Sequence, residues 1–390
     1  MKLVRTVIIV VASALALLVA PTGALQAGKK DAVAPAFEVD PFWPRPLPNH
    51  WILGSTIGVS VDARDHVWIL HRPGTVDENF KAADLVPPVG VCCKVAPPVL
   101  EFDQEGNLLA SWGGPGAGFE WPTSNHGITA DSQGNVWIGG NDETDTQVLK
   151  FTAAGKFLLQ IGKHGVHNGS NDTQNFWRAA KIFEDPAAKE MYIADGYGNR
   201  RVIVVDRDTG AYRRHWGAYG EKPDDSPVPA YTAGGPPSRQ FNTVHCANVS
   251  NDGLVYVCDR VNDRVQVFRR DGTFLKEAFF DTHTLRSGSV WDIAFSRDPQ
   301  QAYLYVANGV DEKISIVDRA TLTVLTSFGD GGRQPGQFYG VHNLATDSHG
   351  NLYATETYNG ARIQRFRYKG VAPVTKAAQG VPWPKSGGPR

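Results

Sequence analysis

The chain has 390 residues, of which 42% are hydrophobic and 20% are charged, so its composition is that of one or two globular domains. The formal net charge is −1, which gives no electrostatic support for binding to nucleic acid or to an anionic membrane. The 41 Gly and 25 Pro residues favour many tight turns, and ten Trp and twelve Tyr residues are typical of strands. No long stretch has a clean helical period, so an all-β protein is predicted.

The first 27 residues have the pattern of a signal peptide. Lys2 and Arg5 form a basic start, residues 6–21 are apolar, and Ala24 or Ala27 is the expected last residue before cleavage. The alternative is an N-terminal anchor that is not cleaved. We therefore expect a secreted or periplasmic protein that makes no membrane contact once the signal peptide has been removed.

The rest of the chain repeats a unit of four short strand-like runs. Residues 28–50 are a proline-rich N-terminal extension, residues 51–370 contain six such units, and residues 371–390 are a C-terminal tail. Six antiparallel four-stranded units predict a six-bladed β-propeller. The sixth unit lacks its fourth run, and residues 37–39 are expected to close the ring as a borrowed edge strand. Two stacked sandwiches are the alternative, which the constant order of the repeat disfavours.

Three of the six units share a longer pattern, in segments 126–137, 245–256 and 342–353. Each segment starts with a histidine, contains a polar turn with Gly, and ends on an aromatic residue eleven positions after the histidine. A turn of this kind between two strand-like runs is a hairpin signal. Equal spacing places His126, His245 and His342 at the same point of the innermost strand in units two, four and six, so the three side chains can converge.

Three neutral imidazoles that converge form a trigonal ligand face and leave one position open for water or substrate, as in catalytic zinc sites. Zn²⁺ is the expected ion, although imidazole also accepts Cu, Ni or Fe. The alternatives are a hydrogen-bonded water cluster or a purely structural ion. At the matching positions the other units have Ile57, a residue near Ala180, and Trp291.

A second set of polar residues follows the second run of several units. Arg72, Tyr197 and Arg260 lie there and are expected around the metal if these strand ends face the same mouth as the histidines. The alternative for the two arginines is a solvated charge at the rim. Asp195 and Asp259, in the same places, are expected to act as turn residues that end their strands.

The chain has four cysteines, which export allows to form disulfides. Cys246 and Cys258 flank one predicted hairpin turn, so we predict a cross-strand bridge, with two free buried thiols as the alternative. Cys92 and Cys93 are adjacent and form either a vicinal bridge or two free thiols. A metal–thiolate site is disfavoured because the chain has no Cys-x-x-Cys pattern.

Several short motifs resemble a known family. Asn199-Arg-Arg-Val, Asn262-Asp-Arg-Val and Asn359-Gly-Ala-Arg-Ile resemble NHL repeats. More closely, residues 50–370 resemble the catalytic domain of peptidyl-α-hydroxyglycine α-amidating lyase. The matching pieces are Val67-Trp-Ile-Leu-His-Arg-Pro-Gly74, His126-Gly-Ile-Thr, Asp195-Gly-Tyr-Gly-Asn199, Val244-His245, Val257-Cys-Asp-Arg260 and Val341-His342.

The resemblance implies a six-bladed propeller in which the three histidines bind a catalytic zinc. It also implies that Arg72 and Tyr197 act on the substrate, and that Arg260 is a further active-site arginine. A structural calcium in the channel is implied as well. The family has Met-Pro-His-Asp around its last zinc ligand, whereas this chain has Gly340-Val-His-Asn343, so Asn343 replaces a carboxylate tied to that calcium.

The function that the resemblance implies is that of a zinc-dependent lyase. It would cleave the C–N bond of an α-hydroxyglycine-like substrate, a small molecule or a peptide end, to give an amide and glyoxylate. Tyr197 would be the general base and Arg72 would hold a carboxylate. The alternatives are a zinc-dependent hydrolase (lactonase or esterase) and a non-catalytic NHL-repeat binding protein. A scaffold has no physical need for the three histidines together with Arg72 and Tyr197, which disfavours the last alternative. We expect a monomer.

Overall fold

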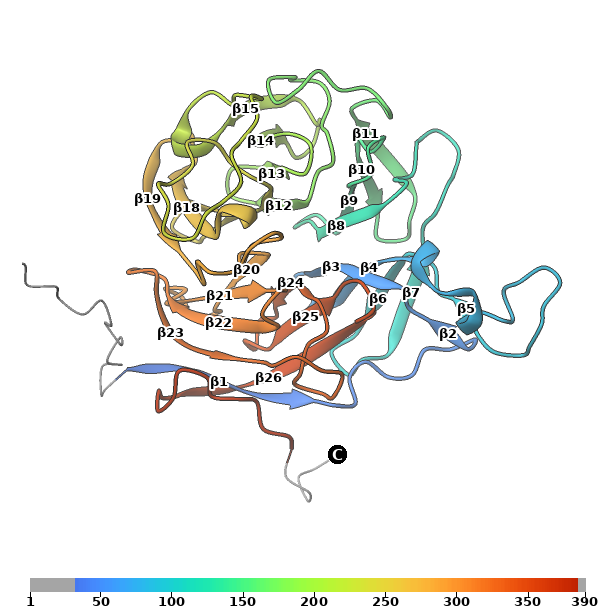
Figure 1. Cartoon of the computed structure of the whole chain (residues 1–390). Helices are drawn as coiled ribbons and strands as arrows, with labels where there is room; N and C mark the ends of the chain where they lie inside the picture. Colours follow the sequence, from blue (N-terminus) through green and yellow to red (C-terminus); the bar gives the residue numbers. More distant parts are fainter. Residues whose placement is uncertain (1–31, 385–390) are drawn as a thin grey trace, which may run out of the picture.

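A computed structural model describes residues 32–384, whose strands form six four-stranded antiparallel sheets around a common axis (Figure 1). The inner strand of each sheet contacts the inner strand of the next, and the last contacts the first, so the ring is closed. The predicted six-bladed β-propeller of NHL-like repeats is confirmed. No helix among residues 32–384 has the length and apolar character needed to span a membrane. The predicted signal peptide, residues 1–27, lies outside the described residues.

Each blade extends from an inner strand at the axis to an outer strand at the rim. From inside to outside, blade 1 consists of β3 (Ser55–Val61), β4 (Val67–Arg72), β6 (Val99–Phe102) and β7 (Leu108–Trp112), and blade 2 of β8 (Asn125–Ala130), β9 (Asn135–Gly140), β10 (Val148–Thr152) and β11 (Phe157–Ile161). Blade 3 consists of β12 (Lys181–Asp185), β13 (Glu190–Asp195), β14 (Arg201–Asp206) and β15 (Tyr212–Trp216), and blade 4 of β16 (Val244–Val249), β17 (Leu254–Asp259), β18 (Arg264–Arg269) and β19 (Phe274–Phe279).

Blade 5 consists of β20 (Asp292–Phe295), β21 (Tyr303–Asn308), β22 (Lys313–Asp318) and β23 (Thr323–Phe328), and blade 6 of β24 (Val341–Thr346), β25 (Leu352–Glu356), β26 (Arg362–Pro373) and β1 (Val33–Asp40). Two short strands, β2 (Trp51–Ile52) and β5 (Lys94–Val95), form a separate parallel pair. The 3-10 helices are η1 (Pro73–Thr75), η2 (Glu78–Phe80), η3 (Ala218–Gly220) and η4 (Arg260–Asn262).

The N-terminal strand completes the last blade. β1 pairs antiparallel with β26, so the two ends of the described chain lie side by side in one sheet (Figure 1). Residues 37–39 therefore do provide the borrowed edge strand. The strand is longer than expected, and the propeller begins at residue 33, inside the segment expected to be an N-terminal extension. At the other end β26 runs to residue 373, because pairing with β1 extends it beyond residue 370.

The aromatic residue near the start of each second strand explains the constant repeat spacing. These side chains are at most 1% exposed: Trp68, Trp137, Tyr192, Tyr256, Tyr305 and Tyr353. In blade 2 the indole Nε1 of Trp137 donates to Asp131 at 3.0 Å, and in blade 6 the hydroxyl of Tyr353 donates to Asp347 at 3.0 Å. Because each aspartate belongs to the hairpin turn before the strand, this bond links turn and strand in one register.

The hydrophobic core is divided into six layers, each between two neighbouring blades. Between blades 4 and 5, for example, Tyr256 and Val265 pack in one cluster with Ile293 and Leu304. A blade therefore buries its two faces only when both neighbours are present. The stability of each blade depends on closure of the ring.

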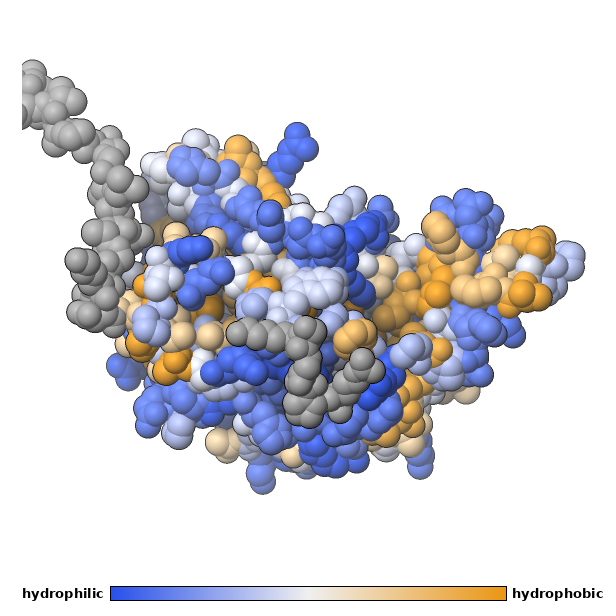
Figure 2. All heavy atoms as spheres, turned by 90° about the horizontal axis from the view of Figure 1, so that it is seen from below, coloured by the Kyte–Doolittle hydropathy of each residue, from blue (hydrophilic) through white to orange (hydrophobic). Residues whose placement is uncertain are grey.

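Residues 73–98, between β4 and β6, form an arm that projects from the ring (Figure 1). Several hydrophobic side chains on it are exposed, including Phe80 (67%), Val86 (98%) and Val91 (93%). Figure 2 shows these hydrophobic residues gathered on the projecting part of the molecule. The arm is an insertion between the second and third strands of blade 1, and it adds no strand to any blade.

The four cysteines form two disulfides. Cys246 and Cys258 lie opposite each other on β16 and β17, with Cα atoms 4.8 Å apart, so the predicted bridge is confirmed. Cys92 and Cys93 form a vicinal bridge in the arm, which is one of the two states left open by the sequence.

We predict that the Cys246–Cys258 bond stabilises the fold modestly, because it closes a loop with a sequence separation of only 12. Replacing both residues with Ala should lower the free energy of unfolding by about 3 kcal/mol in the chain-entropy model, measured by urea denaturation. Mass mapping of the non-reduced protein provides the direct check. Recovery of Cys246 and Cys258 as alkylated thiols would contradict the pairing.

Candidate metal centre

Three histidines meet at the centre of the ring. His126, His245 and His342 lie on the inner strands of blades 2, 4 and 6, and all are at most 2% exposed. One ring nitrogen from each lies within 4.8 Å of the others, and the ring centroids are 5.2, 5.0 and 4.9 Å apart. The structure thus brings together the three residues that the repeat spacing indicated.

A β-bulge at the same point of each inner hairpin accompanies each histidine. The pairing register shifts between His126 and Ile128 in blade 2, between Val244 and Cys246 in blade 4, and between Val341 and Leu344 in blade 6. A bulge adds a residue on one strand and re-aims the side chain there. Because the bulge recurs at the same point of these three hairpins, the equal spacing in the sequence places the three histidines at equivalent positions in space.

Each imidazole is oriented by a backbone carbonyl of the next blade. The Nδ1–H group of each ring donates to this carbonyl, in the pairs His126 with Ala180 at 2.6 Å, His342 with Ile57 at 2.8 Å, and His245 with Trp291. A carbonyl oxygen only accepts hydrogen bonds, so the proton of a neutral ring lies on Nδ1. Each Nε2 is then left with its lone pair, which is the tautomer that a metal ion requires.

The environment keeps these rings neutral. Burial lowers the pKa of His342 to about 3, with Arg72 and Arg260 adding to the shift. Burial also holds the pKa of His126 and His245 well below the ordinary value, reinforced by neighbouring histidines and arginines. Three neutral Nε2 atoms with free lone pairs fit a Zn²⁺ ion and leave room for a further ligand.

Tyr197 lies directly beside this ligand face. Its hydroxyl oxygen is 3.1 Å from Nε2 of His126 and 3.0 Å from Nε2 of His245, and Arg260 donates an NH1 hydrogen bond to it at 3.0 Å. The Arg260 guanidinium lies 5.1 Å from the Tyr197 ring centroid and 4.8 Å from that of Trp291. Arg260 is only 8% exposed, so it is a buried cation and not a solvated rim charge.

Arg72 is fixed at the same mouth by two hydrogen bonds. Its Nε donates to the carbonyl of Asn125 at 2.9 Å, and its NH2 donates to Oδ1 of Asn141 at 2.7 Å. Arg72 also depresses the pKa of His126 and His342, so its charge acts on the triad. The structure therefore places Arg72, Tyr197 and Arg260 around the three histidines.

Arg178 and Asn141 also belong to this mouth, although no motif of the sequence indicated them. Arg178 Nε donates to the carbonyl of Asn141 at 2.8 Å, and its NH1 pairs with Glu143 at 2.5 Å. Its guanidinium lies 5.9 Å from the Tyr197 ring centroid. Neither residue belongs to a repeated motif, since both lie in connections between strands, so the sequence carried no signal for them.

Asp195 and Asp259 have a structural role near the site. Both end their strands, as expected, and both are fully buried. Asp195 pairs with Arg201 at 2.9 Å, and Asp259 pairs with Arg264 at 2.7 Å. These ion pairs anchor the turns that carry Tyr197 and Arg260, which explains the Asp, Asn and Arg pattern of the NHL-like repeat.

The residues near Asn343 do not fit the calcium ion that the resemblance implied. Asn343 offers no carboxylate, and its Nδ2 donates to Asp292 at 3.0 Å. The Asp292 carboxylate already holds Lys181, whose Nζ is 2.6 Å from both of its oxygens. A cationic side chain therefore already pairs with the carboxylate that lies beside Asn343.

Two other groups of ligand-type residues occur among residues 32–384: Asp62 with His66 and Glu101, and Cys246 with Cys258 and Asp292. In the first, Arg64 already pairs with both carboxylates, at 2.9 and 3.1 Å. In the second, the two sulfur atoms are joined in a disulfide. Of the three groups, only the histidine triad has ligand atoms that are held neither by an ion pair nor by a disulfide.

The sequence was compared with known proteins. No family model matches it. The chain is 28% identical over 229 residues to peptidyl-glycine alpha-amidating monooxygenase A of Xenopus laevis, covering 58% of this chain and 22% of that protein. It is 24% identical over 301 residues to NHL repeat-containing protein 3 of Mus musculus, covering 75% of this chain and 70% of that protein. The match thus spans about a fifth of the amidating monooxygenase.

Among solved structures, a virginiamycin B lyase from Staphylococcus aureus aligns with a TM-score of 0.48 at 15% identity, covering 90% of this chain and 92% of that chain. A likeness of this degree carries no conclusion about function. The two sequence similarities do confirm the resemblance expected from the motifs. The chain is a six-bladed propeller homologous to the amidating monooxygenases and to NHL repeat-containing protein 3.

We predict that the purified protein holds one zinc ion per chain, bound through Nε2 of His126, His245 and His342. Changing any one of them to Ala removes a third of the ligand face, and elemental analysis should then find little zinc. His66→Ala, a change in the cluster that Arg64 neutralises, is the matched control and should leave the zinc content unchanged. Full zinc retention in all three triad variants would refute the site.

The turn that carries Arg260 also contains a carboxyl group with an unusual pKa. Asp263 is fully buried, and its carboxylate accepts a hydrogen bond from the backbone N–H of Ser289 at 2.7 Å. Burial raises the pKa of Asp263 to about 7, and the nearby charges of Asp281 and Asp311 add to the effect. The native state therefore favours the protonated carboxyl of Asp263 more than the unfolded state does. The stabilisation of the fold by this protonated group is complete below about pH 4 and is lost as the pH rises toward 7.

We predict that Asp263→Asn flattens this dependence. The difference in melting temperature between variant and native protein should grow in favour of the variant as the pH rises from 5 to about 8, measured by scanning calorimetry. Asp271→Asn, at an exposed aspartate, is the control and should not change the slope. Parallel curves for Asp263→Asn and the native protein would contradict the prediction.

Proposed function

We propose that the protein is an exported, metal-dependent lyase that cleaves the C–N bond of an α-hydroxyglycine-like substrate to give an amide and glyoxylate. One observation carries the proposal: the Tyr197 hydroxyl lies between the Nε2 atoms of His126 and His245 and is held by the buried Arg260. The similarity to peptidyl-glycine alpha-amidating monooxygenase A, a protein named for the amidation of a peptidyl-glycine, supports a substrate of this kind. Export rests on the N-terminal pattern, and a monomeric state is part of the proposal.

The reaction requires one proton to move from oxygen to nitrogen. The substrate hydroxyl loses its proton, the C–N bonding electrons leave with nitrogen, the carbon becomes the aldehyde of glyoxylate, and the nitrogen gains a proton to complete the amide. A zinc ion at the triad would polarise the substrate oxygen as a Lewis acid. Tyr197, as phenolate, takes the proton from the hydroxyl and returns it to nitrogen, so the residue is regenerated. The Arg260 hydrogen bond stabilises the negative oxygen of Tyr197.

The arginines account for recognition of the substrate carboxylate. Arg72 is held by its Nε and NH2 groups, which orients the guanidinium and leaves NH1 without a hydrogen-bond partner among residues 32–384. Arg178 and Arg260 bring two more positive charges to the same mouth, and Glu143 pairs with Arg178 there. A substrate with a negative charge is therefore favoured over a neutral one.

A zinc-dependent hydrolase, such as a lactonase or esterase, is the second candidate. The observation in its favour is that a face of three histidines leaves a position open for a water molecule. In that case Tyr197 would serve as an acid or as a hydrogen-bond donor to the oxyanion, and not as the base of a lyase reaction.

We predict that Tyr197→Phe lowers kcat by about 10²- to 10⁴-fold on N-benzoyl-α-hydroxyglycine, since the change removes the proton-transfer group and keeps the ring. Zinc content and melting temperature should stay at native values. Tyr358→Phe is the matched control, because Tyr358 is an exposed tyrosine near Trp291 at the same mouth. Turnover of a lactone panel by the native protein, without turnover of N-benzoyl-α-hydroxyglycine, would favour the zinc hydrolase, and normal rates in Tyr197→Phe would remove Tyr197 from either mechanism.

We predict that Arg72→Lys mainly raises KM, because lysine keeps the charge but loses the planar fork that binds a carboxylate with two hydrogen bonds. Steady-state kinetics on the same substrate provides the measurement. An unchanged KM together with a large loss of kcat would show that Arg72 acts in the transition state instead.

A further inference from the structure

A buried polar cluster crosses the ring one residue away from the histidine layer. It consists of Lys181 on β12, Asp292 on β20 and Asn343 on β24, which are 6%, 0% and 1% exposed. Lys181 Nζ lies 2.6 Å from both carboxylate oxygens of Asp292. Asn343 Nδ2 and the backbone N–H of Leu344 donate to Asp292 Oδ2 at 3.0 and 2.8 Å. The cluster thus links blades 3, 5 and 6, and blades 3 and 5 are not neighbours in the ring.

Each member of the cluster is adjacent in sequence to a residue that orients the triad. Lys181 follows Ala180, whose carbonyl accepts the hydrogen bond from His126. Asp292 follows Trp291, whose carbonyl accepts the hydrogen bond from His245. Asn343 follows His342 directly. A shift of the Lys181–Asp292 pair therefore displaces the carbonyls that orient His126 and His245, and Asn343 transmits the shift to the backbone next to His342.

The net charge of the cluster is zero only because Lys181 is cationic, Asp292 is anionic and Asn343 is neutral. Burial raises the pKa of the Asp292 carboxyl, and the Lys181 ammonium counteracts this shift. One ammonium and one carboxylate sum to zero, and the neutral Asn343 keeps the sum at zero. A carboxylate at position 343 would add a negative charge that a monovalent cation cannot balance, whereas a divalent ion can. The neutral side chain of Asn343 is therefore compatible with the single positive charge of Lys181.

We propose that Lys181 is a built-in cation that takes the place of a channel calcium and, through Asp292 and Asn343, acts as a positioning residue for the histidine triad. The role in positioning rests on the zinc site of the proposed function, and it is independent of the lyase chemistry.

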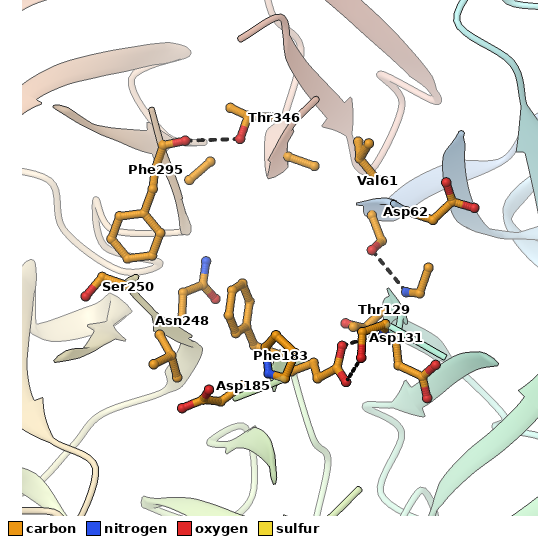
Figure 3. A pocket seen from close by; sticks show the side chains of 18 of the residues that line it. Val61, Asp62, Thr129, Asp131, Phe183, Asp185, Asn248, Ser250, Phe295 and Thr346 are labelled. Atoms are coloured by element: carbon orange, nitrogen blue, oxygen red, sulfur yellow. Dashed lines mark hydrogen bonds between the residues drawn. The ribbon is translucent and has the colours of Figure 1, made fainter. Parts of the chain in front are cut away.

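Solvent reaches this level from the end of the ring opposite the histidines. A cavity of about 560 Å³ opens there, lined by Lys181 together with Thr129, Phe183, Asn248 and Thr346 (Figure 3). The histidines lie toward the start of the inner strands, whereas Thr129 and Thr346 lie near their far ends. A cation added to the solution therefore reaches the Lys181 side chain by a route that does not pass the triad.

The first experiment tests the replacement of calcium. Zinc-loaded native protein should show the same melting temperature in 1 mM CaCl₂ and in a calcium-selective chelator. Lys181→Ala combined with Asn343→Asp removes the ammonium and supplies a second carboxylate, so calcium should raise its melting temperature by several degrees. Stabilisation of the native protein by calcium would overturn the proposal, whatever its zinc content.

The second experiment tests positioning. Lys181→Met should weaken zinc binding by about 10- to 100-fold, the usual effect of losing an outer-shell partner, and should change the visible spectrum of the cobalt-substituted protein. Lys150→Met is the matched control, because Lys150 is also a buried lysine, 3.6 Å from Asp131, and it lies on β10, outside the triad strands. It should lower stability without changing zinc affinity or the cobalt spectrum.

Native zinc affinity and cobalt spectrum in folded Lys181→Met would overturn the positioning role. Asp292→Asn gives the same test if Lys181→Met does not fold, since it removes the other charge of the pair. A native protein that binds no zinc would instead refute the metal centre of the proposed function, and the calcium experiment would still decide the role of Lys181.

Discussion

The hydrogen bond from each histidine Nδ1–H to a carbonyl of the next blade is the constraint on which the site depends. It fixes the tautomer, the ring orientation and the direction of the Nε2 lone pair at once. For His342 the acceptor is Ile57 in blade 1, at the other end of the described chain. The third ligand is therefore oriented only when blade 6 meets blade 1, so the contact between β24 and β3 that closes the ring also completes the metal face.

The alternation of blades follows from the same bond. Blades 2, 4 and 6 supply the imidazoles, and blades 3, 5 and 1 supply the carbonyls of Ala180, Trp291 and Ile57. The three imidazoles and the three acceptor carbonyls therefore alternate around the ring, and each histidine is oriented by a blade that contributes no imidazole itself. The next residue in two of the acceptor blades, Lys181 or Asp292, then ties those strands together across the ring.

The fold and the triad could be predicted from the sequence because both depend on residues that recur with constant spacing. The aromatic residue of each second strand and the aspartate of the preceding turn are local partners, so hairpin and register are visible in a single chain. Arg178 and Asn141 could not be found in this way, since they meet through connections of different blades. The Lys181–Asp292 pair joins residues 111 positions apart, and no local pattern encodes it.

The charge distribution at the mouth bears on the choice between lyase and hydrolase. The three imidazoles are neutral, so a divalent ion there would keep its full charge, and Arg72, Arg178 and Arg260 add three more positive charges around Tyr197. Burying Arg260 against two aromatic rings, with no carboxylate as its partner among residues 32–384, is costly for folding alone. A bound carboxylate offsets this cost, whereas a neutral lactone or ester does not. The electrostatics therefore favour a substrate that brings its own negative charge, as an α-hydroxyglycine does.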